Sequence, residues 1–495
     1  MIQKKHIVQN PKLTLGAVAA LLMLAALDQT IVTTALPTIV TDLGEIEQLS
    51  WVVTIYLLTS TISAPIYGNL GDTFGRKIMM QIAVIIFVSS SLLAAFANTM
   101  WWMLMARAAQ GLGGGGLFVL AFTVVGDIVP SRERGKIQGL FAAVFGLSSI
   151  LGPLAGGFFV DNLSWHWIFF INLPIGILAL LILQYSFSAR QSHPPVELDY
   201  LGAGLLSTSL GSMILFSSSL SNDLNLFAFS KVFLITLCII STLVFLFVEQ
   251  RAKNPILPLN LFSINNFRFY SLIGLLTGSI LFSLLTFIPF YLQVSHGISP
   301  THSGFQIVPL TIGIIFGTFV SGAIVTRTGK YKLLPFTGAL VLSVGLLLMT
   351  QITSNSSSTE ISILLFLVGF GLGPQLSITT AAVQNSAPSY QMGVATAGLT
   401  LFRQIGSSVG VATMTTIFLT KIQSELSSNQ NMLALLNDSK INLQITFILS
   451  EEQKMFFQNA FDDSLKLVLV INLGLSLLII LIALSVKEIP LKTSL

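Results

Sequence analysis

Charged residues are scarce in this chain: they make up 9% of its 495 residues, whereas 53% are hydrophobic. A soluble domain carries about 25% charged residues, so this chain has too little polar surface to be solvated as a globule in water. Its mean hydropathy of +0.84 indicates that lipid is its main solvent. The composition therefore predicts an all-α integral membrane protein.

The chain also lacks the residues that several other classes of protein require. Its one cysteine, Cys238, lies in an apolar run and excludes a disulfide within the chain or a cysteine-based metal site. It has no HExxH motif and no paired membrane acids, and its histidines lie near loops or span ends, so we expect no enzyme and no cofactor. The first apolar run has no small-residue cleavage site after it and is predicted to be a retained helix.

What the chain does have is a series of apolar runs about 20 residues long, the length that a membrane-spanning helix needs. We predict fourteen spans, at 13–37, 50–70, 78–97, 101–126, 137–160, 166–188, 200–219, 231–248, 270–293, 303–326, 333–351, 361–383, 393–419 and 466–486.

Lysine and arginine predict the orientation of these spans, because cytoplasmic loops hold the excess of basic residues. With both termini inside, the outer side receives only Lys231, Lys421, Lys440, Lys454 and Lys466 of the 24 basic residues. Arg107 and Arg403 remain within spans, and the others lie inside. The net charge of +4 is therefore topological and implies no nucleic-acid partner. We expect a cytoplasmic (inner) membrane protein with cytoplasmic termini.

An internal repeat predicts how the spans are grouped. The stretch GNLGDTFGRK (68–77), after the second span, has an echo in GAIVTRTGKYK (322–332), after the tenth. Repeated halves are typical of secondary transporters. We predict a six-helix half at 1–190, two inserted linker helices at 191–260, and a second six-helix half at 261–495 with an outer loop at 421–465.

Several short stretches, in order along the chain, resemble one family. These are LDQTIVTTALP (27–37), GNLGDTFGRK, LMARAAQGLGGG (104–115), GLSSILGPLAGG (146–157), SWHWIFFINLPIG (164–176), YLQVSHGISPTHSG (291–304) and FRQIGSSVGVA (402–412). Together they resemble the fourteen-helix drug:proton antiporter branch of the major facilitator superfamily, although His166 stands where arginine is usual. The resemblance implies proton-coupled efflux of amphiphilic drugs or toxic compounds, powered by the proton gradient.

Asp28 is the only acid deep within an apolar span, and Arg107 is its expected partner. At 1.5 Å per residue, Asp28 lies about 12 Å and Arg107 about 9 Å below the outer surface. A carboxyl group there has its protonation controlled by desolvation and by a nearby cation. We therefore expect Asp28 and Arg107 to couple protons to transport. A static structural pair, or an Arg107 that reaches outward to water, remains the alternative.

GNLGDTFGRK is expected to be a latch on the inner side. Gly68 and Gly75 allow a tight turn and close helix approach, while Asp72 can pair with Arg76 or accept hydrogen bonds from a helix N-terminus. The alternative is a loop whose basic residues only anchor it inside. In the echo, Thr326 stands where Asp72 does, which predicts a weaker latch.

The fifth span carries small residues that the resemblance assigns to a seal between the two halves on the outer side. They are Gly146, Gly152, Pro153, Gly156 and Gly157. Gly152 and Gly156 share a helix face that a neighbouring helix can approach.

The expected cargo site is mostly neutral, with aromatic and polar candidates. They are Gln29, Thr33, Phe287, Tyr291, Gln293 and Arg403. This lining favours neutral or monocationic amphiphiles held by area burial and stacking. Expected partners are small-molecule cargo, protons and the lipid bilayer, with a periplasmic adaptor left open. An exporter of an endogenous metabolite, lipid or siderophore, or an uncoupled facilitator, is the alternative function.

Overall fold

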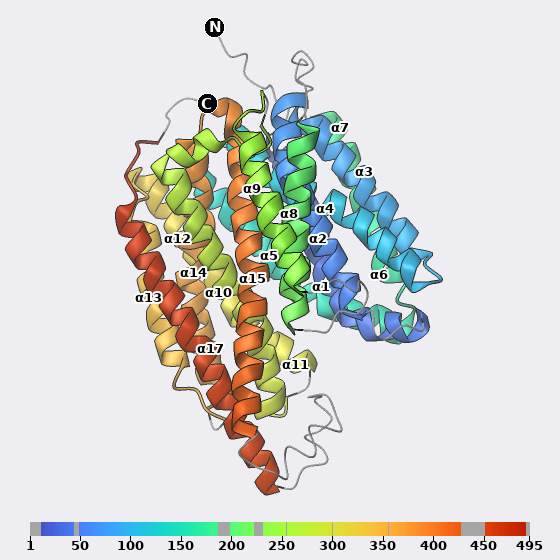
Figure 1. Cartoon of the computed structure of the whole chain (residues 1–495), viewed down its shortest axis with the longest axis vertical. Helices are drawn as coiled ribbons and strands as arrows, with labels where there is room; N and C mark the ends of the chain where they lie inside the picture. Colours follow the sequence, from blue (N-terminus) through green and yellow to red (C-terminus); the bar gives the residue numbers. More distant parts are fainter. Residues whose placement is uncertain are drawn as a thin grey trace.

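The computed structural model describes residues 11–43, 49–186, 199–221, 231–253, 255–298, 300–354, 356–426 and 451–491. Within these residues every regular element is a helix (Figure 1). Eleven of the helices are long and apolar enough to cross a membrane by length and composition. An all-helical arrangement satisfies each backbone N–H and C=O within its own segment, as lipid demands.

The N-terminal half consists of six helical segments, the last of which is broken at Ile171. Their bounds are α1 Pro11–Leu43, α2 Leu49–Phe74, α3 Arg76–Ala95, α4 Met100–Ile128, α5 Arg134–Asn162, and the pair α6 Trp167–Phe170 and α7 Asn172–Ser186.

The C-terminal half also has six segments, and here the second is broken. Their bounds are α10 Asn265–Ser295, the pair α11 Pro300–Phe305 and α12 Val308–Thr328, α13 Leu333–Met349, α14 Ser358–Ser386, α15 Met392–Leu426 and α17 Glu451–Ser485.

Two further helices, α8 (Tyr200–Ser221) and α9 (Lys231–Glu249), lie between the halves in sequence. They pack on one another, and α8 also contacts α2 and α15 (Figure 1). The inserted pair therefore lies beside a contact between the two halves.

The fourteen predicted spans each coincide with a helix or a broken helix. The largest difference is at the last span, which was expected to begin at residue 466, whereas α17 begins at Glu451. Likewise α15 continues to Leu426. The predicted outer loop at 421–465 is therefore helical at both of its ends, and its residues 427–450 lie outside the described part. Hydropathy marks only where apolar residues end, and a helix continues past that point when its polar turns face water.

The two halves share local details that support the repeat. Gly75 and Gly329, which align in the sequence echo, both adopt left-handed backbone conformations, with φ of +96° and +70°. In the last segment of each half, an asparagine reaches the first helix of the same half: Asn172 donates to Asp28 at 3.0 Å, and Asn472 donates to Ser283 at 3.0 Å.

Glycine sets how closely several helices approach. The run Gly113–Gly116 in α4 packs between α2 and α3, and side chains there would meet Tyr56, Ser60 or Ala83. In the other half, a Cβ on Gly369 of α14 would collide with the backbone of Leu310 in α12. The atoms that a Cβ on Gly369 would meet are all backbone, so no flexible side chain could move aside there.

We predict that Gly369→Leu prevents normal accumulation of the protein in the membrane, because α12 and α14 cannot separate without losing their packed interface. Gly474→Leu is the matched control, since nothing lies within 4 Å of the Cβ position of Gly474. Membrane abundance and gel-filtration profile in mild detergent are the measurements. Equal abundance of the two variants would contradict the close packing of α12 and α14.

Candidate functional site

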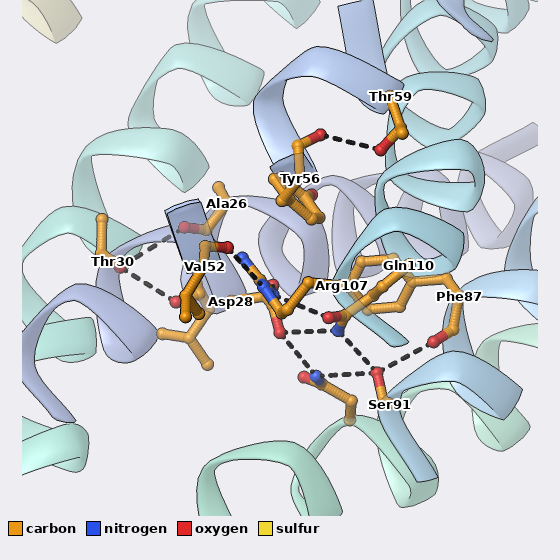
Figure 2. Close-up of polar contacts among 12 residues, drawn as sticks. Ala26, Asp28, Thr30, Val52, Tyr56, Thr59, Phe87, Ser91, Arg107 and Gln110 are labelled. Atoms are coloured by element: carbon orange, nitrogen blue, oxygen red, sulfur yellow. Dashed lines mark hydrogen bonds and ion pairs between the residues drawn. The ribbon is translucent and has the colours of Figure 1, made fainter. Parts of the chain in front are cut away.

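An ion pair lies inside the N-terminal half. Arg107 of α4 donates from Nη1 to Oδ2 of Asp28 of α1 at 2.6 Å (Figure 2). The side chains are 1% and 0% exposed, so both charges are removed from solvent. The predicted proximity of these two residues is therefore found in the structure.

The second carboxylate oxygen of Asp28 is held by two amides. Oδ1 accepts from Nε2 of Gln110 at 2.8 Å and from Nδ2 of Asn172 at 3.0 Å. The hydroxyl of Ser91 accepts from both amides, at 2.7 and 3.2 Å, and donates to the carbonyl of Phe87 at 2.9 Å. The carboxyl group thus accepts three hydrogen bonds, an arrangement suited to its ionised form because an ionised carboxylate can only accept.

Arg107 is equally well satisfied. Besides Asp28, its Nη1 donates to Oε1 of Gln110 at 2.7 Å, and its Nε donates to the carbonyl of Val52 at 3.3 Å. Its guanidinium lies 4.3 Å from the centroid of the Tyr56 ring (Figure 2). Gln110 therefore bridges the two members of the ion pair, and both charges are compensated without water.

Sequence reasoning missed Gln110, Ser91 and Asn172. One signal was present: Gln110 follows Arg107 by three residues and so shares its helix face. Asn172 is the first residue of α7, directly after the break at Ile171, which the apolar pattern does not mark. Thus five helical segments, α1, α2, α3, α4 and α7, supply the site.

The predicted latch residues also lie together. Asp72, at the end of α2, is paired with Arg76, whose Nε donates to Oδ2 of Asp127 at 3.0 Å. Asp72 also accepts from the backbone N–H of Gly393 at 3.2 Å and of Val394 at 2.9 Å. These amides open α15, so a carboxylate of one half lies at the positive N-terminal end of a helix of the other.

Glycines bring the latch helices together. A Cβ on Gly68 would collide with Ala397 of α15, and one on Gly71 would reach Arg76 and Leu120 at 2.8 Å. Gly75, with its positive φ, makes the turn from α2 into α3.

Two other contacts join the halves near the latch. Nε2 of Gln384 in α14 donates to the carbonyl of Phe122 in α4 at 3.0 Å. In the echo, the hydroxyl of Thr326 donates to the carbonyl of Arg132 at 2.9 Å. Thr326 thus makes one neutral hydrogen bond between the halves, whereas Asp72 makes two charge-assisted ones.

The predicted outer-seal residues do not form one contact. A Cβ on Gly146 would meet Thr311 of α12, so this glycine lies between the halves, whereas Gly152 faces Thr30 of α1 within one half. Gly156 is buried, and Gly157 has nothing within 4 Å of its Cβ position. The side chain of Pro153 lies outside the described residues.

The cargo-lining candidates are dispersed. Phe287 and Tyr291 are buried in the core of the C-terminal half, where Phe287 packs on Phe418 with ring centroids 5.2 Å apart. Gln293 donates to Ser303 at 2.9 Å, beside the junction of α10 with α11. Gln29 is half-buried beside Asp28 in α1, and the side chain of Thr33 lies outside the described residues.

Arg403, the remaining candidate, lies in α15. Its Nη2 contacts α14 at the carbonyl of Leu376 and the hydroxyls of Thr379 and Thr380, each at 3.4 Å.

His166, the departure from the resembled pattern, lies outside the spanning helices. Its ring stacks on Trp165 with centroids 3.7 Å apart, and its Nδ1 lies 2.5 Å from the hydroxyl of Ser164. Burial lowers the pKa of the His166 imidazole, against the opposing effect of Asp42. Trp165 in turn donates to Asp42 at 2.8 Å.

Comparison with known proteins identifies the family. Residues 18–411 match the model of the Major Facilitator Superfamily, so the chain belongs to this superfamily of membrane transporters. It is 37% identical over 387 residues to multidrug transporter protein MdtP of Bacillus subtilis, covering 78% of this chain and 71% of that one. It is 33% identical over 420 residues to multidrug resistance protein 3 of the same organism, covering 83% and 81%.

The solved proton:xylose symporter XylE, bound to 6-bromo-6-deoxy-D-glucose, has the same fold. Its TM-score is 0.63 at 14% identity, with 98% of each chain covered. The family match and the two multidrug relatives confirm the resemblance seen in the sequence motifs, and this family consists of transporters. The fold of XylE confirms the predicted all-helical membrane fold.

We predict that Arg107→Gln destabilises the protein strongly, because it leaves the Asp28 carboxylate buried without its cation. Removing one member of a buried pair costs about 3–5 kcal/mol. The double variant Asp28→Asn/Arg107→Gln should recover part of this loss, since neither charge remains. Thermal unfolding in detergent of the wild type, both single variants and the double variant completes the cycle. Additive losses would show that the two side chains do not interact.

Proposed function

We propose that the protein exports amphiphilic drugs or other toxic small molecules across the cytoplasmic membrane, coupled to proton entry by alternating access. The multidrug transporters to which it is similar support the cargo class. The observation that carries the coupling is the fully buried Asp28 carboxylate, bonded to Arg107, Gln110 and Asn172.

The geometry supports a specific order of events. In the proposed starting state the latch closes the inner side, as the bonds of Asp72 to Gly393 and Val394 of the other half support, and Asp28 is ionised. When the halves rock, a shift of α4 relative to α1 withdraws Arg107, and desolvation then favours the protonated form of Asp28. Return of Arg107 expels the proton toward the side then open. The Asp28 carboxylate is thus partnered either by Arg107 or by a proton, in alternation.

The driving force is sufficient to bias such a transition. One charge that crosses the membrane potential contributes about 2.3 kcal/mol per 100 mV. A bias of this size changes the ratio of two states about fifty-fold, so it inverts the populations of two states that differ by about 1 kcal/mol.

We further propose the arrangement of the chain in the membrane. The halves comprise residues 1–190 and 261–495, with 191–260 as an inserted linker, and both termini are cytoplasmic in the inner membrane. A periplasmic adaptor would reach the outer segment at 427–450. Reporter fusions at Leu495 and within 427–450 should report opposite sides of the membrane, because an odd number of spans separates them. The same side for both would overturn this topology.

We predict that Asp28→Asn abolishes uphill efflux without removing the protein from the membrane. Asparagine keeps the size of the side chain and can still accept from Gln110 and Asn172, but it cannot titrate near neutral pH. Arg107 loses its carboxylate yet keeps Gln110, Val52 and the Tyr56 ring as partners, so we expect a less stable protein that still reaches the membrane. The measurement is dye efflux from proteoliposomes under an imposed pH step, with proton movement recorded in parallel.

Asp42→Asn is the matched control, since Asp42 is an exposed carboxylate at the outer end of the same helix. It should transport normally. Uphill pumping by the Asp28→Asn variant would place the coupling elsewhere. Dye transport by the wild type that moves no protons and runs only down the dye gradient would indicate an uncoupled facilitator.

We predict that Asp72→Asn slows transport about ten-fold or more, because hydrogen bonds to a charged group contribute about 1.5–3 kcal/mol. Without this stabilisation the state that is closed on the inner side is populated less, so the protein opens to the outside less often. Thr326→Val removes only one neutral bond and should slow transport less. Initial efflux rates in everted vesicles, normalised to protein amount, test both. Equal rates for wild type and Asp72→Asn would reduce the latch to a topological loop.

A further inference from the structure

Arg403 is a cation near the centre of the membrane. It follows Met392, the first residue of α15, by about 17 Å of helix at 1.5 Å per residue, and the hydrocarbon core is about 30 Å thick. Lipid headgroups therefore lie too far away to pair with it. A membrane-embedded arginine is costly, and its usual justification is a functional partner.

The partners that Arg403 has are neutral and distant. All three of its hydrogen bonds come from Nη2, and each is 3.4 Å long. Its Nε is buried without a hydrogen-bond partner. Among the described residues, no ion pair includes Arg403.

Arg107 shows within the same molecule what compensation looks like. It has a carboxylate at 2.6 Å, an amide oxygen at 2.7 Å, a backbone carbonyl at 3.3 Å and an aromatic face at 4.3 Å. Arg403 has none of the charged or aromatic partners of this kind within the described part. A charge in the membrane is costly for both arginines, yet among the described residues only Arg107 is neutralised by a carboxylate of the protein.

Arg403 lies at the end of the buried part of α15, where the contact between the two halves ends. Residues Met392–Leu399 of α15 are all buried, whereas Thr400 and Arg403 are partly exposed. On α14, Thr380 contacts Arg403, and one turn further Gln384 reaches Phe122 of the other half. Because residues four apart share a helix face, Arg403 lies against the face of α14 that is directed toward the N-terminal half.

We infer that Arg403 is an anion subsite that binds the carboxylate or sulfonate of a monoanionic amphiphilic cargo. Its Nε–H and the Nη2–H on the same side form an edge with the spacing of a two-oxygen anion. Nε has no partner there, and the neutral oxygens that Nη2 contacts, each at 3.4 Å, are distant enough to give way to an anion. The hydroxyls of Thr379 and Thr380 already donate to carbonyls of α14, at Gln375 and Leu376, and therefore orient the guanidinium without offering hydrogens to the anion.

Among the described residues no second basic group contacts this guanidinium, and a single guanidinium favours one negative charge over a phosphate dianion. This subsite revises the expectation from sequence that neutral or monocationic compounds fit best. It rests on the proposed export function for its cargo role, whereas binding of the anion itself does not depend on proton coupling.

Two dyes with one skeleton test the subsite: 1-anilinonaphthalene-8-sulfonate carries a sulfonate, and N-phenyl-1-naphthylamine lacks it. Binding is measured by titration calorimetry with the full chain in lipid nanodiscs, with empty nanodiscs subtracted. Arg403→Gln should weaken sulfonate binding about ten-fold or more, as loss of charge-assisted hydrogen bonds requires. Binding of the neutral dye should change by less than about two-fold.

Arg268→Gln is the charge-matched control, because it also removes one arginine but at an exposed position. Among the described residues, the polar partner of the Arg268 side chain is Asn265, at 2.7 Å. It should bind both dyes as the wild type does. Arg403→Lys keeps the charge and should retain the sulfonate preference, which carries the test if the glutamine variant does not fold.

Absence of sulfonate binding by the wild type, or equal losses for both dyes on Arg403→Gln, would overturn the subsite. Asp28→Asn separates this proposal from the coupling proposal, since it should lose uphill efflux yet keep sulfonate binding. An Asp28→Asn protein that pumps would refute the coupling and leave the subsite standing.

Discussion

The carboxylate of Asp28 imposes the strongest constraint on the N-terminal half. An ionised group in a low-dielectric interior must be paired and fully hydrogen-bonded, or it becomes protonated. Here the pairing requires Arg107 from α4, while Gln110 and Asn172 hold the other oxygen and Ser91 orders both amides. Four helical segments are therefore held in register by one charge, and a movement of any of them would break hydrogen bonds to it or to the amides that hold it.

The same chemistry makes the two halves unequal although their folds repeat. Asn472 reaches Ser283 in the C-terminal half as Asn172 reaches Asp28 in the N-terminal half, so a hydroxyl stands where the acid does. On the inner side, Thr326 makes one neutral bond where Asp72 makes charged ones. The scaffold thus repeats, whereas the acids at these two compared positions occur in the N-terminal half alone.

The sequence predicted the parts of this arrangement that depend on depth and on local turns. Asp28 and Arg107 were expected together because their distances from the outer surface agree, and GNLGDTFGRK contained both the glycine with positive φ and the acid that caps a helix. Rotation about a helix axis was not predictable in the same way. Asn172 points at Asp28 because α6 and α7 break at Ile171, and an apolar run does not show such a break. Phe287 was expected to line the cargo site but is buried in the core of the C-terminal half. The spacing of apolar residues along a helix does not distinguish a face that packs on other helices from one that faces the cargo.

Charge placement then connects coupling with recognition. The N-terminal half carries a balanced pair, and a proton that binds Asp28 leaves Arg107 in excess by one positive charge. The C-terminal half carries Arg403, which the described residues leave uncompensated. If an anionic cargo neutralises Arg403 while Asp28 remains ionised, the loaded and proton-free protein has both halves neutral at membrane depth. Protonation without cargo leaves each half with one uncompensated cation, and that state is the costlier one in lipid. In the proposed exchange, the protonated and cargo-free protein is therefore the state of highest energy, and it is the state that must return after the cargo is released.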